Sequence, residues 1–183
     1  MIDFIQQGDT THNYTAVNVN AGAQSIDSDF GTYAGFSGSD SASGSGGSFA
    51  GGGTMISEHV FSVARTIKQV IFRPYGNVSS NSSTDNAARC DYAIQYQLEG
   101  SSTWVTFTSG SGSAGSGSSG GSNSGNMDPG TLTLNQTVQN VKKIRVTVSN
   151  GGSFHNDNGS HSWDLRIYEV QAYGDISGYA AII

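Results

Sequence analysis

One stretch near the C-terminal end of the chain alternates so regularly that it constrains the fold more than any other feature. From Lys143 to Ser149, polar residues alternate with Ile144, Val146 and Val148. A period of two places these three apolar side chains on one face of a β-strand, and the polar ones on the other. The segment is therefore predicted to be a strand with one face in a core.

The next apolar run, residues 165–173, changes parity partway along. In its first part the apolar residues, such as Ile167, are at odd-numbered positions, whereas in its second part they, such as Val170, are at even-numbered positions. One extra residue inserted into one strand of an antiparallel pair produces such a shift. We therefore predict a β-bulge at Tyr168 and Glu169, which would re-aim the acidic side chain.

The rest of the chain is typical of short strands separated by turn residues, without an amphipathic helix of useful length. Further strands are expected at residues 15–19, 60–64, 67–73, 92–98, 104–108 and 132–138. Several short strands bounded by turn residues favour an all-β sandwich or barrel. The 183-residue length favours one domain, which we place at residues 1–174, followed by an apolar tail at 175–183.

Two tracts, residues 35–53 and 109–125, consist almost wholly of Gly, Ser and Ala. Such segments bury too little apolar surface to offset the entropy cost of ordering them. We expect long loops rather than linkers, because a domain boundary in the second tract would leave each half with too few strands for a core. Alternatively, the tracts pack on the surface of a neighbouring subunit, where small residues let two backbones approach each other closely.

The composition argues against several classes of partner. Only 12% of residues are charged and the formal net charge is −6, so we expect no nucleic-acid partner, which would need a basic surface. No stretch approaches the roughly 20 apolar residues of a membrane-spanning helix, and the N-terminal residues do not resemble a signal peptide. The single cysteine, Cys90, excludes an internal disulfide and is expected to be a small buried side chain.

Three motifs occur in a familiar order. Residues 92–107 form a hairpin pattern with Glu99-Gly100 at its turn, Val141 to Val146 reads Val-x-x-Ile-Arg-Val, and Leu165 to Gly174 reads Leu-x-x-x-Glu-Val-x-Ala-Tyr-Gly. Together they resemble the discoidin or coagulation-factor-type C domains and the related galactose-binding-like carbohydrate-binding modules. The resemblance implies an all-β, eight-stranded antiparallel jelly-roll β-sandwich.

The same resemblance implies a structural calcium site. Its candidate ligands are Asp27, Asp29, Thr32 and Glu169. Calcium takes six to eight oxygen ligands, which carboxylates, a hydroxyl and backbone carbonyls can supply. Ser28 and Ala34 depart from the family's glycine and tryptophan in the early loop. The alternative is that the early carboxylates only shape a solvated turn.

In the resembling modules, ligands bind among loops at one end of the sandwich. The candidates here are Phe154, His155, Asn156, Asp157, Asn158 and His161, with Arg73, Tyr75 and Asn77 expected just after another strand. Sugars suit such a set, because C–H faces stack on a ring while planar polar groups pair with hydroxyls. Alternatively, the Asn and Gly residues only shape a hairpin loop and the histidines are solvent-exposed. Trp104 and Trp163 are expected in the core.

No catalytic motif occurs in a credible setting, so we expect no enzyme. The expected function is a non-catalytic carbohydrate-binding module that acts as a virion surface, decoration or tail-associated adhesion protein of a bacteriophage. Its partners would be a cell-surface or polysaccharide glycan and neighbouring virion subunits, the latter contacted through the apolar tail. One alternative is a purely structural capsid protein without glycan binding. The other is an accessory module of a cellular adhesin, placed outside the cell by another export route.

Overall fold

The computed structural model describes residues 1–15, 33–42, 47–49, 54–80, 89–111, 123–151, 154–156 and 159–175. Every regular element among these residues is a strand, and all the strand pairs are antiparallel. The all-β antiparallel class predicted from the sequence is therefore confirmed.

The strands differ greatly in length. They are β1 (Ile2–Asp3), β2 (Thr10–Thr15), β3 (Ala34–Ala42), β4 (Gly47–Phe49), β5 (Thr54–Ser80), β6 (Arg89–Leu98), β7 (Val105–Ser111), β8 (Asn123–Met127), β9 (Leu132–Gly151), β10 (Phe154–Asn156) and β11 (Gly159–Gly174). A nine-stranded sheet has the order β1-β11-β5-β9-β6-β7, with β2 and β8 attached to β5 and β3 attached to β11. The β4 and β10 strands form a separate two-stranded sheet.

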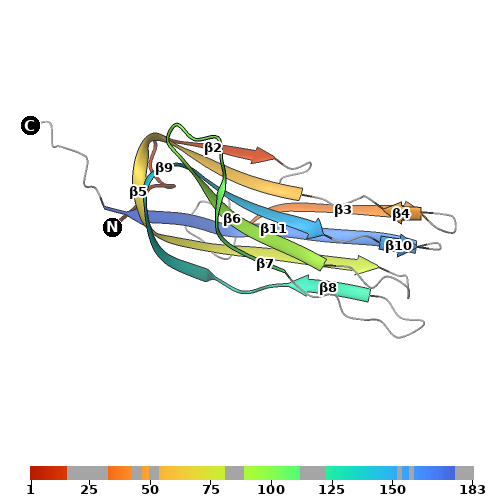
Figure 1. The fold of residues 1–183 in the computed structure, drawn as a ribbon. Helices are drawn as coiled ribbons and strands as arrows, with labels where there is room; N and C mark the ends of the chain where they lie inside the picture. Colours follow the sequence, from red (N-terminus) through yellow and green to blue (C-terminus); the bar gives the residue numbers. More distant parts are fainter. Residues whose placement is uncertain are drawn as a thin grey trace, which may run out of the picture.

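Two long strands, β5 and β9, run through both layers of the sandwich and curve sharply near the N-terminus (Figure 1). The first layer, here the β6 layer, contains β2, residues 54–60 of β5, the second half of β9, β6 and β7. The second, the β11 layer, contains β1, β3, β11, residues 67–80 of β5, β8 and the first half of β9.

The sequence predicted two strands at residues 60–64 and 67–73, and two more at 132–138 and 143–149. In the structure each pair is one continuous strand. The register between β5 and β9 slips three times from Val60 to Gln69, which marks the bend between the layers. Bulges turn a strand without reversing the chain, so each pair of predicted strands can continue through the corner. On β9 the bend includes Asn140, whose φ is 63°.

The core lies between the layers. Its largest side chains include Phe61, Phe72, Ile144 and Leu165, all fully buried. The apolar parity predicted for residues 144–148 is confirmed, since all three residues of that parity are buried.

The two layers come close together where Gly76 of β5 faces Cys90 of β6. A Cβ atom added at Gly76 would lie 2.6 Å from the Cys90 Cβ and Sγ atoms. Cys90 is fully buried, and burial together with the Asp91 charge raises the pKa of its thiol to about 12. The interpretation of Cys90 as a small buried side chain is confirmed.

The bulge predicted in the last strand is present. The register between β11 and β5 shifts between Ile167 and Val170, where the paired residue on β5 passes from Pro74 to Phe72. Two consecutive residues, Glu169 and Val170, are both buried here, which strict alternation would not allow. The change of parity in the sequence therefore corresponds to this shift of register.

Part of the first Gly/Ser tract is not the loop that the sequence predicted. Residues 34–42 form β3, which pairs with β11 from Gly159 to Ile167, and residues 47–49 form β4. The backbone supplies these hydrogen bonds, so pairing with a longer strand orders a segment that has few apolar side chains. Residues 43–46, 50–53 and 112–122 lie outside the described part of the chain, as do 16–19 of the strand expected at 15–19.

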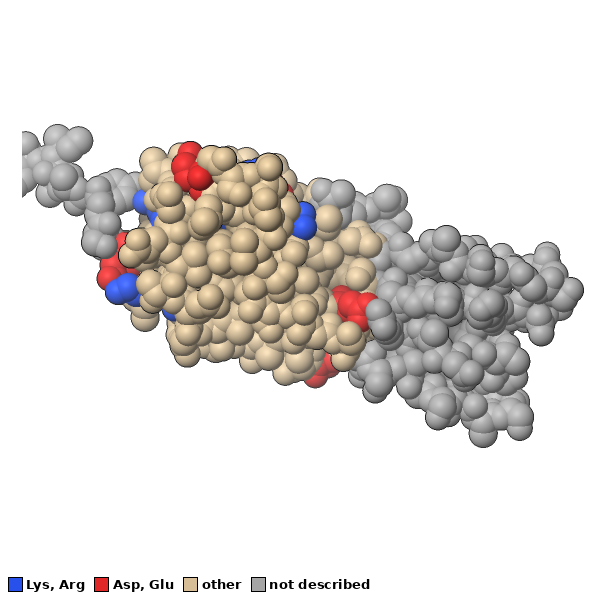
Figure 2. Space-filling view, viewed as in Figure 1, with Lys and Arg blue, Asp and Glu red and all other residues tan. Residues whose placement is uncertain are grey.

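Charged side chains are few on the face shown in Figure 2, where small red and blue groups lie mostly toward the margins of the described surface. The described part of that face carries no broad basic patch of the kind that a phosphate backbone would attract. Separately, the described residues include no helix long and apolar enough to cross a membrane.

Candidate functional site

Arginine and tyrosine side chains gather on the outer face of the β11 layer. Alternation along β11 buries Leu165 and Ile167, so Asp164, Arg166 and Tyr168 project from the opposite face. The same alternation on β5 buries Phe72 and Pro74 and leaves Arg73 and Tyr75 half-buried on the outer face. We call this surface the arginine–tyrosine face; its members are Tyr33, Arg73, Tyr75, Asp128, Asp164, Arg166 and Tyr168.

Arg166 lies at the centre of this face. Its guanidinium carbon is 4.3 Å from the centre of the Tyr33 ring and 5.0 Å from that of Tyr75, its register partner on β5. Its Nη1 donates to the Tyr168 hydroxyl at 3.2 Å, and its Nε donates to Asp164 at 3.1 Å. The hydrogen bonds to Asp164 raise the pKa of Arg166 above its ordinary value, so the guanidinium remains charged.

Arg73 lies on the same face, two residues before Tyr75 on β5, and makes similar contacts. Its guanidinium carbon lies 4.4 Å from the centre of the Tyr168 ring, and its Nη2 is 3.4 Å from the Asp128 carboxylate. The Tyr168 ring also contacts Tyr33 and Tyr75, with ring centres 5.3 Å and 6.3 Å away. The two arginines and three tyrosines therefore form one contiguous set of stacked and edge-on contacts.

The face can contact a ligand without first reorganising. The side chains of Arg73 and Arg166 are 29% and 26% exposed, and those of Asp128 and Asp164 are 35% and 33% exposed. The tyrosine rings and ion pairs hold the guanidinium groups, so less rotamer entropy is lost when they bind. Two positive charges are balanced by two negative charges, so the set selects for neither acidic nor basic ligands.

The structure places only two of the predicted ligand-binding residues in this face. Arg73 and Tyr75 do belong to it, but they lie inside β5 rather than just after a strand, which corrects the sequence prediction. Asn77 is the next outward residue of β5 and pairs in register with Asp164.

The other predicted ligand residues lie in the segment at 154–161. The backbone of Phe154, His155 and Asn156 forms β10, which pairs with β4, and the backbone of His161 lies in β11 opposite Ser80. The side chains of these four residues, and all of Asp157 and Asn158, lie outside the described part of the structure. Their role in binding stays a prediction.

Sequence reasoning missed five members of the face. They are Tyr33, Asp128, Asp164, Arg166 and Tyr168. Three of them alternate with the apolar residues of β11, so the outward parity of that strand was a usable signal. The cross-strand pairing of Arg166 with Tyr75 was not, because it depends on the register of two distant segments.

Trp104 does not lie in the core as expected. It precedes β7 and is half-buried, with the guanidinium carbon of Arg145 4.1 Å from the centre of its ring. Trp163 pairs with Val78 and Gly38, but its side chain lies outside the description.

The structure describes one of the four predicted calcium ligands. Glu169 is fully buried at the bulge of β11, whereas Asp27, Asp29 and Thr32 lie outside the described residues. Within the described part of the chain, no three His, Cys, Asp or Glu side chains form a group that could hold a metal ion. The calcium site stays a prediction from the family resemblance.

Comparisons with known proteins find similarity in structure only. No protein-family model matches the chain, and no curated protein matches it significantly. The family 32 carbohydrate-binding module of NanJ from C. perfringens, solved with galactose, shares 18% identity at a TM-score of 0.49, covering 94% of this chain and all of that one. A second such module, from a family 31 glycoside hydrolase of Clostridium perfringens, shares 14% identity at a TM-score of 0.45, covering 91% and 92%.

A larger protein is also similar over part of its length. The GH29 fucosidase of Ruminococcus gnavus, solved with fucose, shares 12% identity at a TM-score of 0.48; the match covers 95% of this chain but 27% of the fucosidase. At these identities the similarity concerns the fold alone. Carbohydrate-binding modules are among the solved structures to which this chain is similar in fold.

Proposed function

We propose that this protein is a non-catalytic glycan-binding module and that the arginine–tyrosine face holds the sugar. The observation that carries the proposal is the placement of two half-exposed guanidinium groups among three tyrosine rings, with two carboxylates beside them. Planar donors and acceptors at fixed positions pair well with adjacent hydroxyl groups, and the ring edges and faces accept sugar C–H groups. The charge balance of the face favours neutral sugars.

The first prediction concerns Arg166→Met. Methionine keeps an unbranched apolar stem between Tyr33 and Tyr75 but removes all the donors of the guanidinium. A hydrogen bond to a charged group contributes about 1.5–3 kcal/mol, so we expect the affinity for a binding glycan to fall about tenfold or more. The measurement is a glycan-array screen of the purified protein, followed by titration of the strongest sugar into both proteins.

Lys68→Met is the matched control for this substitution. Lys68 is also a partly exposed cation in an ion pair, with Asp175, but it lies outside the arginine–tyrosine face. It should bind the glycan like the unmodified protein. Equal affinity of Arg166→Met and Lys68→Met for the glycan would remove this face from the proposal.

We also propose, following the sequence, that the module belongs to the surface of a bacteriophage virion, where glycan binding would attach the particle to a cell. The support is the apolar character of residues 176–183, which suits docking on a neighbouring subunit; these residues lie outside the description. Deleting residues 179–183 should then abolish incorporation into particles while leaving the thermal unfolding of the sandwich unchanged. Normal incorporation of the truncated chain would count against this setting.

A further inference from the structure

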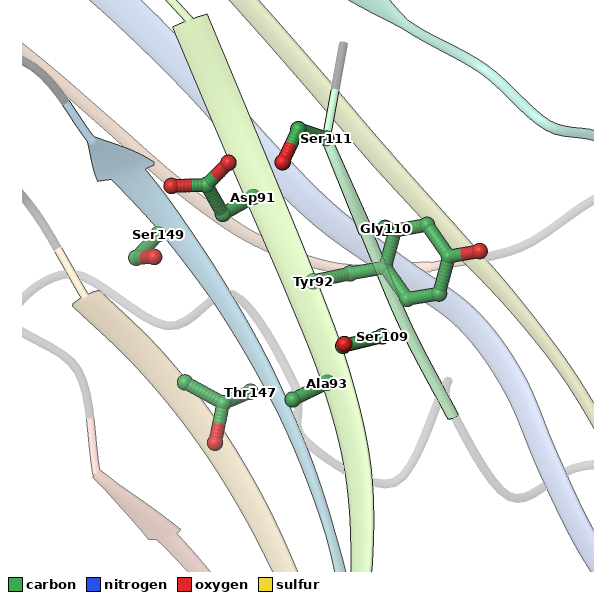
Figure 3. A pocket seen from close by; sticks show the side chains of 8 residues that line it. All are labelled: Asp91, Tyr92, Ala93, Ser109, Gly110, Ser111, Thr147 and Ser149. Carbon is green, nitrogen blue, oxygen red and sulfur yellow. The ribbon is translucent and has the colours of Figure 1, made fainter. Parts of the chain in front are cut away.

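A shallow depression of about 450 Å³ lies on the outer face of the other layer, over β9, β6 and β7 (Figure 3). Side chains from three strands line it in rows of register partners across the strands, which we call rungs. Asp91 of β6 pairs in register with Ser149 of β9 and Ser111 of β7, and on the next rung Ala93 pairs with Thr147. The volume falls within the range of pockets that hold small ligands.

The depression follows from the sizes of the outward side chains. The first two rungs carry small side chains, and the third carries Arg145 and Gln95. Arg145 lies over the Trp104 ring and its Nε donates to the Gln95 Oε1 at 2.8 Å. The floor of small residues therefore ends at a wall made of Arg145 and Gln95.

The wall is held in place by a chain of contacts. Gln95 accepts from Arg145 and donates through its Nε2 to the Thr106 hydroxyl at 3.1 Å. From the rung of Asp91 to that of Gln95 the strand advances about 13 Å, which is longer than one sugar ring.

The polar groups of the depression indicate the ligand class. Hydroxyl groups of Ser and Thr dominate the lining, and among the lining residues described Asp91 is the only charged one. Carboxylate and hydroxyl oxygens at fixed positions accept hydrogen bonds from the hydroxyl groups of a sugar.

We propose that this depression is a second glycan-binding site, which takes an oligosaccharide along the strands over the rung of Asp91 and the rung of Ala93 and Thr147. The inference takes its ligand class from the proposed function, but it uses no residue of the arginine–tyrosine face. The two sites lie on the outer faces of opposite layers, so one molecule could hold two segments of polysaccharide. Linked binding of this kind raises the apparent affinity for a long chain without any new contact.

The test compares two Thr→Trp substitutions on the same strand. Thr147→Trp fills the depression, whereas Thr137→Trp places the same side chain at an exposed position of β9 outside both sites. Retardation in native gels containing a β-glucan, a galactan, a mannan or a xylan identifies the polysaccharide that binds. Calorimetric titration with an oligosaccharide from that polysaccharide then gives the number of sites per chain.

We expect two sites per chain in the unmodified protein and in Thr137→Trp, and one in Thr147→Trp. Arg166→Met should also leave one site, and the double variant Thr147→Trp/Arg166→Met none. An unchanged number of sites in Thr147→Trp would overturn the second site while leaving the arginine–tyrosine face standing. Full loss in Thr147→Trp with no effect of Arg166→Met would instead support the depression and overturn the first site. Failure of every polysaccharide to retard the unmodified protein would overturn both.

Discussion

Replacing Gly174 with alanine should lower the free energy of unfolding by about 3 kcal/mol or more. A Cβ atom at this position would lie 2.0 Å from the backbone oxygen of Thr66 and 2.7 Å from a ring carbon of Phe4. Overpacking a core commonly costs about 1–3 kcal/mol, and here the nearest atom belongs to the backbone, which cannot move aside as a side chain can. Urea unfolding of both proteins measures the difference.

The cost is large because three parts of the chain meet at Gly174. Thr66 lies at the corner where β5 passes between layers, and Gly174 ends β11 opposite Ile67. The Phe4 backbone N–H donates to the Ala172 carbonyl at 2.8 Å, which ties the N-terminal segment to the same point. Moving any one of these segments to make room would disturb the other two.

Gly8→Ala is the matched control. No atom lies within 4 Å of a Cβ added at Gly8, and its backbone is outside the left-handed region, so the change should be close to neutral, within about 0.5 kcal/mol. If Gly174→Ala unfolds at the same urea concentration as Gly8→Ala, the close approach of the three segments is not present in solution. Glycan affinity of the folded Gly174→Ala protein should be unchanged, because neither proposed site includes Gly174.

Gly174 also illustrates what sequence could and could not predict. The glycine was recognised as the end of a family-like motif, but only the structure gives its physical reason, which is the Thr66 backbone beside it. The bulge before it was predictable because a change of parity within one strand is written in consecutive residues. A contact between residues 66 and 174 is not, since it depends on how β5 bends.

For the candidate sites too, the pattern of a single strand predicts some features, whereas others depend on how strands pair. Alternation along β11 predicts which side chains leave the core, and Arg166 is on the outward parity. Its stacking on Tyr33 and Tyr75 requires the register of β11 against β5, which the pattern of a single strand does not contain. The depression depends similarly on β9, β6 and β7 placing small residues on the same rungs, so no single motif marks it.

Lowering the pH should destabilise the folded protein through His59. His59 is fully buried in the β6 layer, where its Nδ1 lies 2.9 Å from the Nδ1 of His12 on β2 and its Nε2 lies 2.9 Å from the Ser57 hydroxyl. The Tyr14 ring stands edge-on to His59, with ring centres 6.4 Å apart. Burial, together with the nearby His12, lowers the pKa of His59 from 6.5 to about 3.

The sign of the effect follows from the number of protons bound. Below pH 6.5 the unfolded chain protonates His59 while the folded protein keeps it neutral, so acid favours unfolding until the pH reaches about 3. The slope approaches about 1.4 kcal/mol per pH unit, which gives a loss of roughly 3 kcal/mol at pH 4. The lowered pKa of His12 acts in the same direction, whereas burial raises the pKa of Asp3 and so opposes it.

The contribution of His59 can be isolated with His59→Gln. Glutamine can still hydrogen-bond to Ser57 or His12 but does not titrate. The variant should be less stable at pH 7 because it packs less well, yet lose less stability between pH 6.5 and pH 4 than the unmodified protein. Urea unfolding across this range measures both slopes, and the Asp3 contribution cancels in their difference. Parallel slopes would mean that His59 is protonated in the folded protein. Since the histidine pair faces the core and both proposed glycan sites face outward, acid should act on binding only by unfolding the sandwich.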